Sequence, residues 1–126
     1  MSNRPATVLL VDDYPDTLEM WTLYLRSHGY EVTTADNGLD ALSKARSERP
    51  NLVILDLDLP GISGYEVARR LRGGEGTATM PLIAATGYSA DHLVEEARDA
   101  GFNAVLIKPC DPAGLVRTIE TVLAAH

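Results

Sequence analysis

Short apolar segments that alternate with segments of helical spacing constrain the fold of this chain most strongly. The apolar runs at residues 8–11 and 52–55 contain no alternating polar residue, which is typical of parallel strands covered by helices on both faces. The alternation predicts an α/β fold in which a strand–helix unit is repeated five times around a doubly wound parallel sheet. The five predicted strands are Thr7–Val11, Tyr30–Ala35, Leu52–Leu55, Pro81–Ala85 and Ala104–Ile107.

Helix start and stop signals lie between these apolar segments. Ser63 with Glu66 forms a capping-box pattern for the third helix, and Asp111 followed by Pro112 is a typical start for the fifth. The first helix is predicted by Leu18, Trp21, Thr22 and Leu25, which have the spacing i, i+3, i+4, i+7, and Gly29 is its stop signal. The second helix is predicted by Leu39, Leu42 and Ala45 before Pro50, and the fourth by Ser89 at its start and Gly101 at its end.

Length and composition favour one domain, which we assign to residues 1–126, and no output domain is expected in this chain. The 126 residues carry a formal charge of -7, which argues against direct nucleic-acid binding. Cys110 is the sole cysteine, so no internal disulfide can form, and no apolar run reaches the roughly 20 residues that span a bilayer. These features predict a cytoplasmic protein without membrane insertion.

Polar residues stand at the ends of four predicted strands. Asp12 and Asp13 follow the first strand, Asp56 the third, Thr86 the fourth and Lys108 the fifth. Because the carboxyl ends of parallel strands meet at one edge of the sheet, these side chains are expected to converge. Clustered carboxylates repel one another unless a cation neutralises them, and hard oxygen ligands suit Mg²⁺. One carboxylate, most naturally Asp56, then remains available as a nucleophile.

Each of these residues also has a simpler interpretation. Asp12 or Asp13 could be a helix cap, and Lys108 alone could be an ordinary surface charge. Asp56 directly follows a buried strand, where a carboxylate needs partners other than the core. The combination at four strand ends therefore favours a site over four unrelated surface residues.

The same segments resemble the receiver domains of two-component response regulators over nearly the whole chain. The matching segments are Val8-Leu9-Leu10-Val11-Asp12-Asp13, Leu55-Asp56 through Pro60-Gly61, Ala85-Thr86-Gly87 and Ile107-Lys108-Pro109. The resemblance implies a flavodoxin-like sheet with strand order 2-1-3-4-5. It also implies a phosphorylation-dependent signalling switch rather than an enzyme, one that catalyses only its own phosphorylation and dephosphorylation.

Residue roles follow from this resemblance. It implies that Asp56 accepts a phosphoryl group from a sensor histidine kinase or a histidine phosphotransfer protein. Lys108, the Thr86 hydroxyl and the Gly87 backbone N–H would then bind the phosphoryl group. Mg²⁺ would be held by Asp13 and Asp56 directly, by Asp12 through water and by the main-chain carbonyl of Asp58. We expect Mn²⁺ to substitute for Mg²⁺ at this site. The Lys108-Pro109 bond is often cis in this family.

The chain departs from the family pattern at several positions. Val105 stands three residues before Lys108, where many receivers carry an aromatic switch residue, so we expect a muted or unusual switch. Cys110 replaces a frequent Phe and is expected to pack as a small hydrophobic side chain. Asp58 and Tyr88 are expected to flank the phosphoryl group and to influence its lifetime.

Three other functions are compatible with parts of the sequence. Asp56-Leu57-Asp58 resembles the nucleophile motif of Mg²⁺-dependent phosphohydrolases of the haloacid dehalogenase type, but that family normally needs a longer chain. A flavin- or nucleotide-binding domain would share the fold, although no glycine motif that cradles phosphate follows a strand. A non-phosphorylated interaction module would not need the acidic, Thr and Lys positions together.

Overall fold

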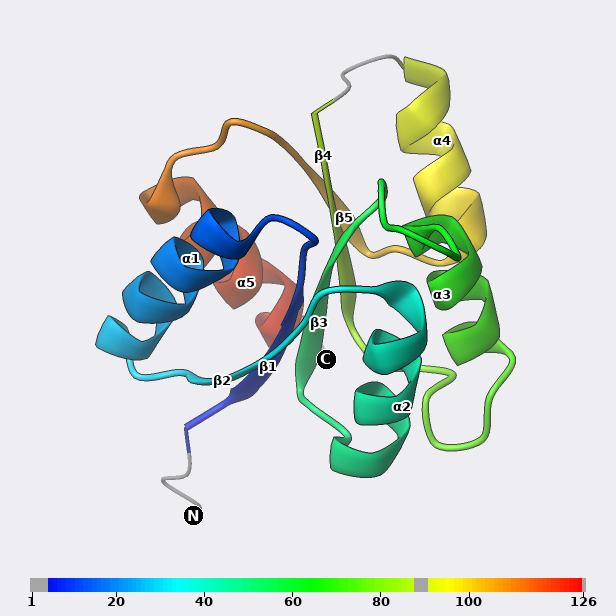
Figure 1. Ribbon diagram of the computed structural model, residues 1–126, viewed down its shortest axis with the longest axis horizontal. Helices are drawn as coiled ribbons and strands as arrows, with labels where there is room; N and C mark the ends of the chain where they lie inside the picture. Colours follow the sequence, from blue (N-terminus) through cyan, green and yellow to red (C-terminus); the bar gives the residue numbers. More distant parts are fainter. Residues whose placement is uncertain (1–4, 88–90, 126) are drawn as a thin grey trace.

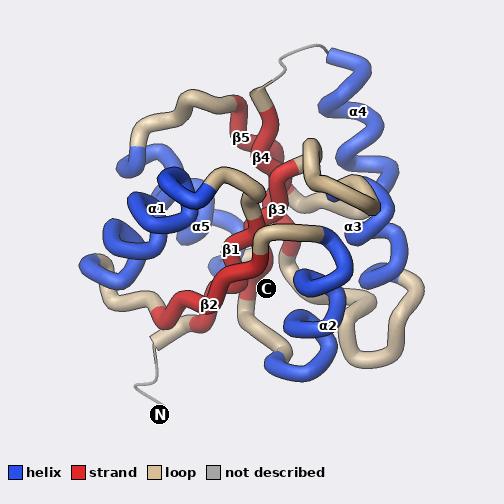
Figure 2. Tube along the Cα trace, viewed as in Figure 1, coloured by secondary structure: helices blue, strands red, loops and turns tan. Residues whose placement is uncertain are grey.

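The computed structural model describes residues 5–87 and 91–125, which form five strands and five helices in strict alternation. Figure 1 shows a central sheet between two groups of helices, and Figure 2 shows the same arrangement by type of element. The elements are β1 (Thr7–Val11), α1 (Pro15–Ser27), β2 (Glu31–Ala35), α2 (Gly38–Glu48), β3 (Leu52–Asp56), α3 (Gly64–Arg72), β4 (Leu82–Thr86), α4 (Asp91–Ala100), β5 (Ala104–Ile107) and α5 (Pro112–Ala124).

The sheet is parallel throughout and has the order β2-β1-β3-β4-β5, as predicted. Helices α1 and α5 lie on one side of it, and α2, α3 and α4 lie on the other (Figure 1). Successive strand residues point to opposite faces, so each strand contributes to two cores. In β1, for example, Leu9 packs with residues of α2 and α3, whereas Leu10 packs with residues of α1 and α5. This two-sided burial explains the absence of polar alternation in the central strands.

The strand predictions are confirmed to within one residue at each end. β1 and β5 have the predicted bounds, whereas β3 and β4 each extend by one polar residue, to Asp56 and Thr86. These residues belong to the hydrogen-bonded ladder because Asp56 pairs with Ala85, and Thr86 pairs with Ile107. Two polar residues of the candidate site are therefore fixed by sheet hydrogen bonds rather than placed on a loop.

The predicted helix boundaries hold where they can be compared. The side chains of Ser63 and Asp111 accept hydrogen bonds from the backbone N–H three residues on, at 3.3 and 2.8 Å. Gly29 and Gly101 adopt left-handed φ angles of +89° and +110° after α1 and α4, which residues with a Cβ rarely adopt. Ser89 lies outside the described residues.

Leu39 differs from the expectation drawn from apolar spacing. It is 62% exposed, and α2 instead buries Gly38, Ala41, Leu42 and Ala45. The helix is capped by Asn37, whose side chain accepts a hydrogen bond from the Asp40 backbone N–H at 2.8 Å. In the described part of the chain, no helix is both long and apolar enough to cross a membrane.

Candidate functional site

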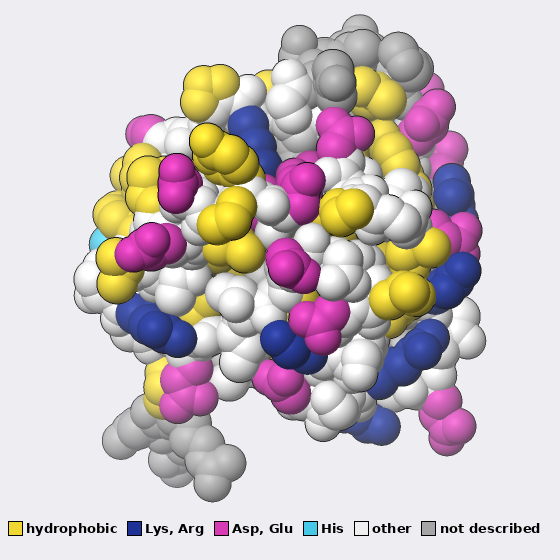
Figure 3. All heavy atoms as spheres, in the orientation of Figure 1, with side chains coloured by type: hydrophobic (Ala, Val, Ile, Leu, Met, Phe, Trp, Pro, Cys, Tyr) yellow, Lys and Arg dark blue, Asp and Glu magenta, His cyan; other side chains and the backbone are white. Residues whose placement is uncertain are grey.

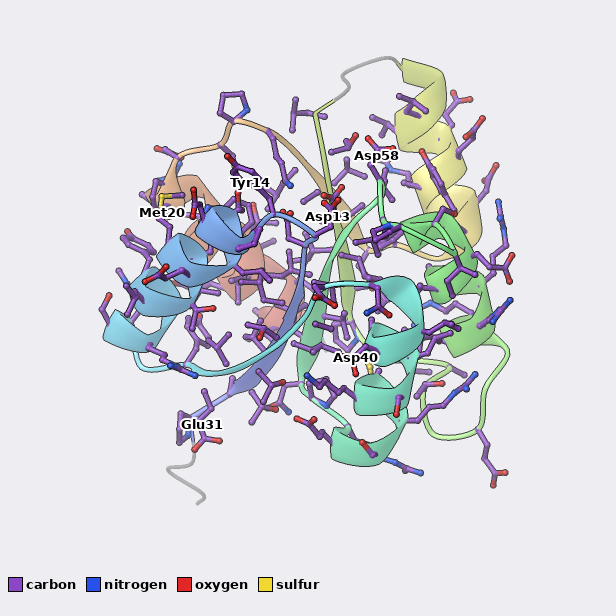
Figure 4. The ribbon with its side chains drawn as sticks, in the orientation of Figure 1. Asp13, Tyr14, Met20, Glu31, Asp40 and Asp58 are labelled. Atoms are coloured by element: carbon purple, nitrogen blue, oxygen red, sulfur yellow. The ribbon has the colours of Figure 1, made fainter. Side chains whose placement is uncertain are left out.

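The candidate site lies at the carboxyl edge of the sheet, where β1, β3, β4 and β5 end. Asp12 and Asp13 follow β1, Asp56 ends β3, and Lys108 follows β5. In Figure 4, the labelled Asp13 and Asp58 lie at this edge, on the loops that leave β1 and β3. The space-filling view shows several acidic side chains on this face (Figure 3). The predicted convergence of the strand-end residues is therefore present.

Three carboxylates form the centre of the site. One carboxylate oxygen from each of Asp12, Asp13 and Asp56 lies within 4.8 Å of the others. Asp12 is 3% exposed and Asp56 is 8% exposed, whereas Asp13 is open to solvent. Two carboxylates of the cluster, those of Asp12 and Asp56, are thus buried, and that of Asp13 is accessible to solvent.

Lys108 connects the two buried carboxylates. Its Nζ donates to Asp12 Oδ2 at 2.5 Å and to Asp56 Oδ2 at 3.3 Å. Burial of the ammonium group lowers the pKa of Lys108, but the hydrogen bonds and negative charges of Asp12 and Asp56 outweigh this effect and raise it overall. Lys108 is therefore not the ordinary surface charge of the simpler interpretation.

The local backbone fixes the orientation of Asp56. Its Oδ1 accepts a hydrogen bond from the Asp58 backbone N–H at 2.9 Å, while Oδ2 faces Lys108. Burial raises the pKa of Asp56, and the hydrogen bond from Asp58 and the charge of Lys108 offset this only in part. The ionised carboxylate is thus held in a partly desolvated position with incomplete charge compensation.

Gly64 is a residue of the site that sequence reasoning missed. A Cβ at this position would lie 2.4 Å from the main-chain oxygen of Asp56 and 2.9 Å from the Cα of Leu57. The Gly64 N–H also donates to the Leu57 carbonyl at 3.1 Å, which closes the loop between β3 and α3. The glycine therefore allows the start of α3 to pack directly against the backbone that carries Asp56.

Asp12 has a local structural role as well, although it is not a helix cap. Its Oδ1 accepts from the Tyr14 backbone N–H at 2.9 Å, and its Oδ2 accepts from Lys108. The N-cap of α1 is Tyr14, which makes no side-chain capping bond. Asp13 makes no hydrogen bond or ion pair with any other residue that the structure describes. The helix-cap interpretation thus accounts for neither aspartate.

Thr86 and Gly87 lie on the neighbouring strand end. Thr86 is 2% exposed at the last position of β4, and Gly87 is exposed. Lys108 is brought next to this strand because its backbone N–H donates to the Thr86 carbonyl at 2.7 Å. The peptide bond between Lys108 and Pro109 is cis, as the family resemblance suggested.

The donor set of the cluster fits a hard divalent cation. Three carboxylates face one ammonium group, so the cluster carries an excess of negative charge when all four groups are ionised. Mg²⁺ is bound in proteins through one or two carboxylates together with water and phosphate oxygens. The open carboxylate of Asp13 beside the buried carboxylate of Asp56 suits that pattern.

A comparison with protein families agrees with this geometry. The family model of the response regulator receiver domain matches residues 8–120. The chain belongs to this family. Receivers are phosphorylation-dependent signalling switches of two-component systems, and the chain is therefore a switch of this type.

Individual relatives cover nearly the same length. Protein PilH of Pseudomonas aeruginosa is 34% identical over 119 residues, which are 94% of this chain and 98% of PilH. The structure of the chemotaxis response regulator CheY4 of Vibrio cholerae is 31% identical, with a TM-score of 0.89 over 94% of this chain and 98% of that chain.

A third relative contains a metal ion. It is the receiver domain of a sensor histidine kinase from Pseudomonas aeruginosa, with magnesium coordinated in its active-site cleft. It is 32% identical to this chain, with a TM-score of 0.89, and the match covers 95% of this chain and 98% of that chain. None of these relatives supports the phosphohydrolase alternative.

The positions that depart from the family pattern can also be located. Val105 is partly buried and packs on the core between the sheet and α2–α4. Cys110 is partly buried against the core between the sheet and helices α1 and α5, and burial raises the pKa of its thiol. Asp58 is exposed at the edge of the site, whereas Tyr88 lies outside the described residues.

Proposed function

We propose that Asp56 is the phosphoryl acceptor of this receiver and that a phosphohistidine side chain is the donor. The observation that carries the proposal is the position of the Asp56 carboxylate. It ends a central strand, shares a 4.8 Å cluster with Asp12 and Asp13, and lies 3.3 Å from Lys108 Nζ. A carboxylate in this position can attack the phosphorus of a phosphoryl group when Lys108 and a bound cation neutralise the negative charge of the phosphoryl oxygens.

In the proposed transfer, an Asp56 carboxylate oxygen forms a bond to phosphorus. The bond between phosphorus and the donor's imidazole nitrogen breaks and its electron pair stays on that nitrogen. The donor leaves as neutral histidine because its other ring nitrogen is protonated before the transfer. Lys108 is already positioned beside Asp56 Oδ2, so its ammonium group can bind a phosphoryl oxygen with little movement. The protein thus contributes mainly positioning and charge neutralisation.

Metal binding is part of the proposal. Asp13 and Asp56 would hold Mg²⁺ through their carboxylates, Asp58 through its main-chain carbonyl, and Asp12 through water. Both Asp12 oxygens already accept hydrogen bonds, from Tyr14 and Lys108, which favours the indirect role for this residue. When bound, the cation supplies positive charge to the carboxylates and the phosphoryl oxygens. Mn²⁺ has the same preference for oxygen ligands and is proposed as a substitute.

Switching is assigned to the neighbouring strand end. The Thr86 hydroxyl would turn to the phosphoryl group, and the Gly87 backbone N–H would donate to it. Because Thr86 is buried at the end of β4, a change in its side chain must be accommodated by the residues packed around it. Phosphorylation would thereby alter the surface formed by α4, β5 and α5.

The proposed partners are a sensor histidine kinase or a histidine phosphotransfer protein, and a downstream protein that reads the altered surface. Apolar side chains next to the site offer a contact surface for the donor: Tyr14 and Met20 of the α1 region are 61% and 54% exposed (Figure 4). A cavity of about 370 Å³ lies between Met20 and Lys108. We further infer a cytoplasmic location and no catalysis beyond the chain's own phosphorylation and dephosphorylation. Nucleic-acid binding and membrane insertion are not part of the proposal.

The test is phosphorylation by acetyl phosphate, followed by intact mass. With Mg²⁺, the wild-type chain is expected to gain one phosphoryl group, which hydroxylamine removes as expected for an acyl phosphate. Asp56→Asn should gain none. Asp40→Asn, a matched change on α2, should behave as wild type (Figure 4). An adduct of equal yield in Asp56→Asn would refute Asp56 as the acceptor. Equal yield with a chelator in place of Mg²⁺ would refute the role of the metal.

A further inference from the structure

Tyr65 connects α3 with α4. Its hydroxyl donates to the Leu93 carbonyl at 3.5 Å, and its ring packs against the core between the sheet and α2–α4. A hydrogen bond of this length is at the weak limit of the interaction. Small movements of either helix can therefore form or break it at little cost.

Tyr65 also shares a cavity with Thr86. The cavity has a volume of about 280 Å³ and is lined by Leu57, Asp58, Tyr65, Thr86 and Leu93. It adjoins the loop after Asp56 on one side and α4 on the other, and among the residues that the structure describes Tyr65 is the one aromatic residue that lines it. A buried side chain that borders free volume can change its orientation without forcing the surrounding backbone apart.

On this side of the sheet, β5 carries the aliphatic residues Val105 and Ile107 and no aromatic ring. Thr86 pairs with Ile107, and side chains alternate along a strand, so Val105 and Thr86 face the same side of the sheet. Val105 packs in the same core as Tyr65. Within the described residues, an aromatic ring that reaches α4 and shares a cavity with Thr86 thus comes from α3, through Tyr65.

We propose that Tyr65 transmits the state of the phosphorylation site to α4. When Thr86 turns toward a phosphoryl group on Asp56, the shared cavity changes shape, the Tyr65 ring shifts, and its hydrogen bond to the Leu93 carbonyl changes. Tyr65 is in this sense a positioning residue and takes no part in phosphoryl transfer. The inference rests on the proposed function, because it needs Asp56 to be the phosphoryl site.

The test uses beryllofluoride with Mg²⁺ as a phosphoryl mimic. Binding is followed by fluorine NMR, and the response of α4 is followed by amide hydrogen exchange of residues 93–100 at saturating beryllofluoride. Tyr65→Phe removes only the hydroxyl. Tyr30→Phe is the matched control, because Tyr30 is a partly buried tyrosine that packs in the core on the opposite side of the sheet.

In the wild type and in Tyr30→Phe, beryllofluoride is expected to change the exchange rates of α4. In Tyr65→Phe, that change should fall by half or more although beryllofluoride is bound. A full wild-type change in Tyr65→Phe would overturn the inference, as would an equal loss in Tyr30→Phe or a wild-type α4 that does not respond. Absence of bound beryllofluoride in the wild type would instead overturn the proposed function, and fluorine NMR identifies that case separately.

Discussion

Replacement of Arg72 with alanine is expected to destabilise the fold far more than its position on a helix surface suggests. Arg72 is in the last turn of α3, and its guanidinium group makes five hydrogen bonds. The acceptors are the carbonyls of Ala78, Met80 and Gly101 and the side-chain oxygen of Asn103. One side chain thus joins the end of α3, the loop before β4 and the end of α4.

The magnitude follows from these contacts. Burial lowers the pKa of Arg72, which indicates a partly desolvated charge that the carbonyl oxygens must compensate. Hydrogen bonds to a charged group make a net contribution of about 1.5–3 kcal/mol each to stability, but the contributions of bonds that share one side chain are not additive. We therefore expect Arg72→Ala to lower the free energy of unfolding by about 2–4 kcal/mol, because it removes a partly buried hydrogen-bond network.

The matched control is Arg70→Ala on the same helix. Arg70 is exposed, and its side chain pairs with Glu66, four residues earlier, at 3.0 Å. Such pairs contribute about 0.3–0.5 kcal/mol, so Arg70→Ala should be nearly neutral. Arg72→Lys keeps the charge but loses the planar guanidinium group with its several N–H donors. The free energy of unfolding of this variant should lie between those of the two alanine variants. Urea unfolding measures all three, and an Arg72→Ala loss no larger than that of Arg70→Ala would refute the reasoning.

Three further predictions concern other residues. The pKa of Asp56 in the folded protein lies above its unfolded value of 3.8. Ionised Asp56 therefore destabilises the fold at pH values above the folded-state pKa, and this penalty disappears at pH values well below 3.8, where Asp56 is protonated in both states. In metal-free buffer, Asp56→Asn should therefore unfold at higher urea than wild type at neutral pH and lose this advantage in acid; a pH-independent difference would contradict this. Burial raises the pKa of Cys110, so its alkylation by iodoacetamide should be slower than that of a cysteine peptide at pH 8, and equal rates would disprove it. Gly64→Ala should lower the free energy of unfolding by about 1–3 kcal/mol and slow phosphorylation. Gly73→Ala is the control and should do neither, because a Cβ at Gly73 would have its nearest neighbour at 3.6 Å. The same urea midpoint for both variants would count against the close contact at Gly64.

Most of the fold could be predicted because the central strands are buried on both faces. Burial of that kind produces apolar runs such as Leu52–Leu55, which can be recognised without knowing their neighbours. The carboxyl ends of the strands followed from the same runs, so the clustering of Asp12, Asp56 and Lys108 was predictable from topology alone. Caps such as Ser63 and Asp111 are local signals and were equally accessible.

Contacts between distant segments could not be predicted in this way. Arg72 lies 29 residues from Gly101, and nothing in the local pattern indicates that the two meet. Gly64 looks like an ordinary residue at a helix start, and only the packed structure shows its approach to the Asp56 backbone. Leu39 has an apolar side chain at a suitable spacing, yet α2 buries the face formed by Gly38, Ala41, Leu42 and Ala45 and leaves Leu39 exposed. The contact between Tyr65 and Leu93 likewise depends on how α3 and α4 pack.

The central claim is tested most directly by locating the phosphoryl group on the chain. After phosphorylation in the presence of Mg²⁺, reduction with borohydride converts an aspartyl phosphate to homoserine, which tandem mass spectrometry can assign to one residue. The account predicts homoserine at position 56 and at no other aspartate. Homoserine at Asp12, Asp13 or Asp58, with residue 56 unchanged, would contradict it.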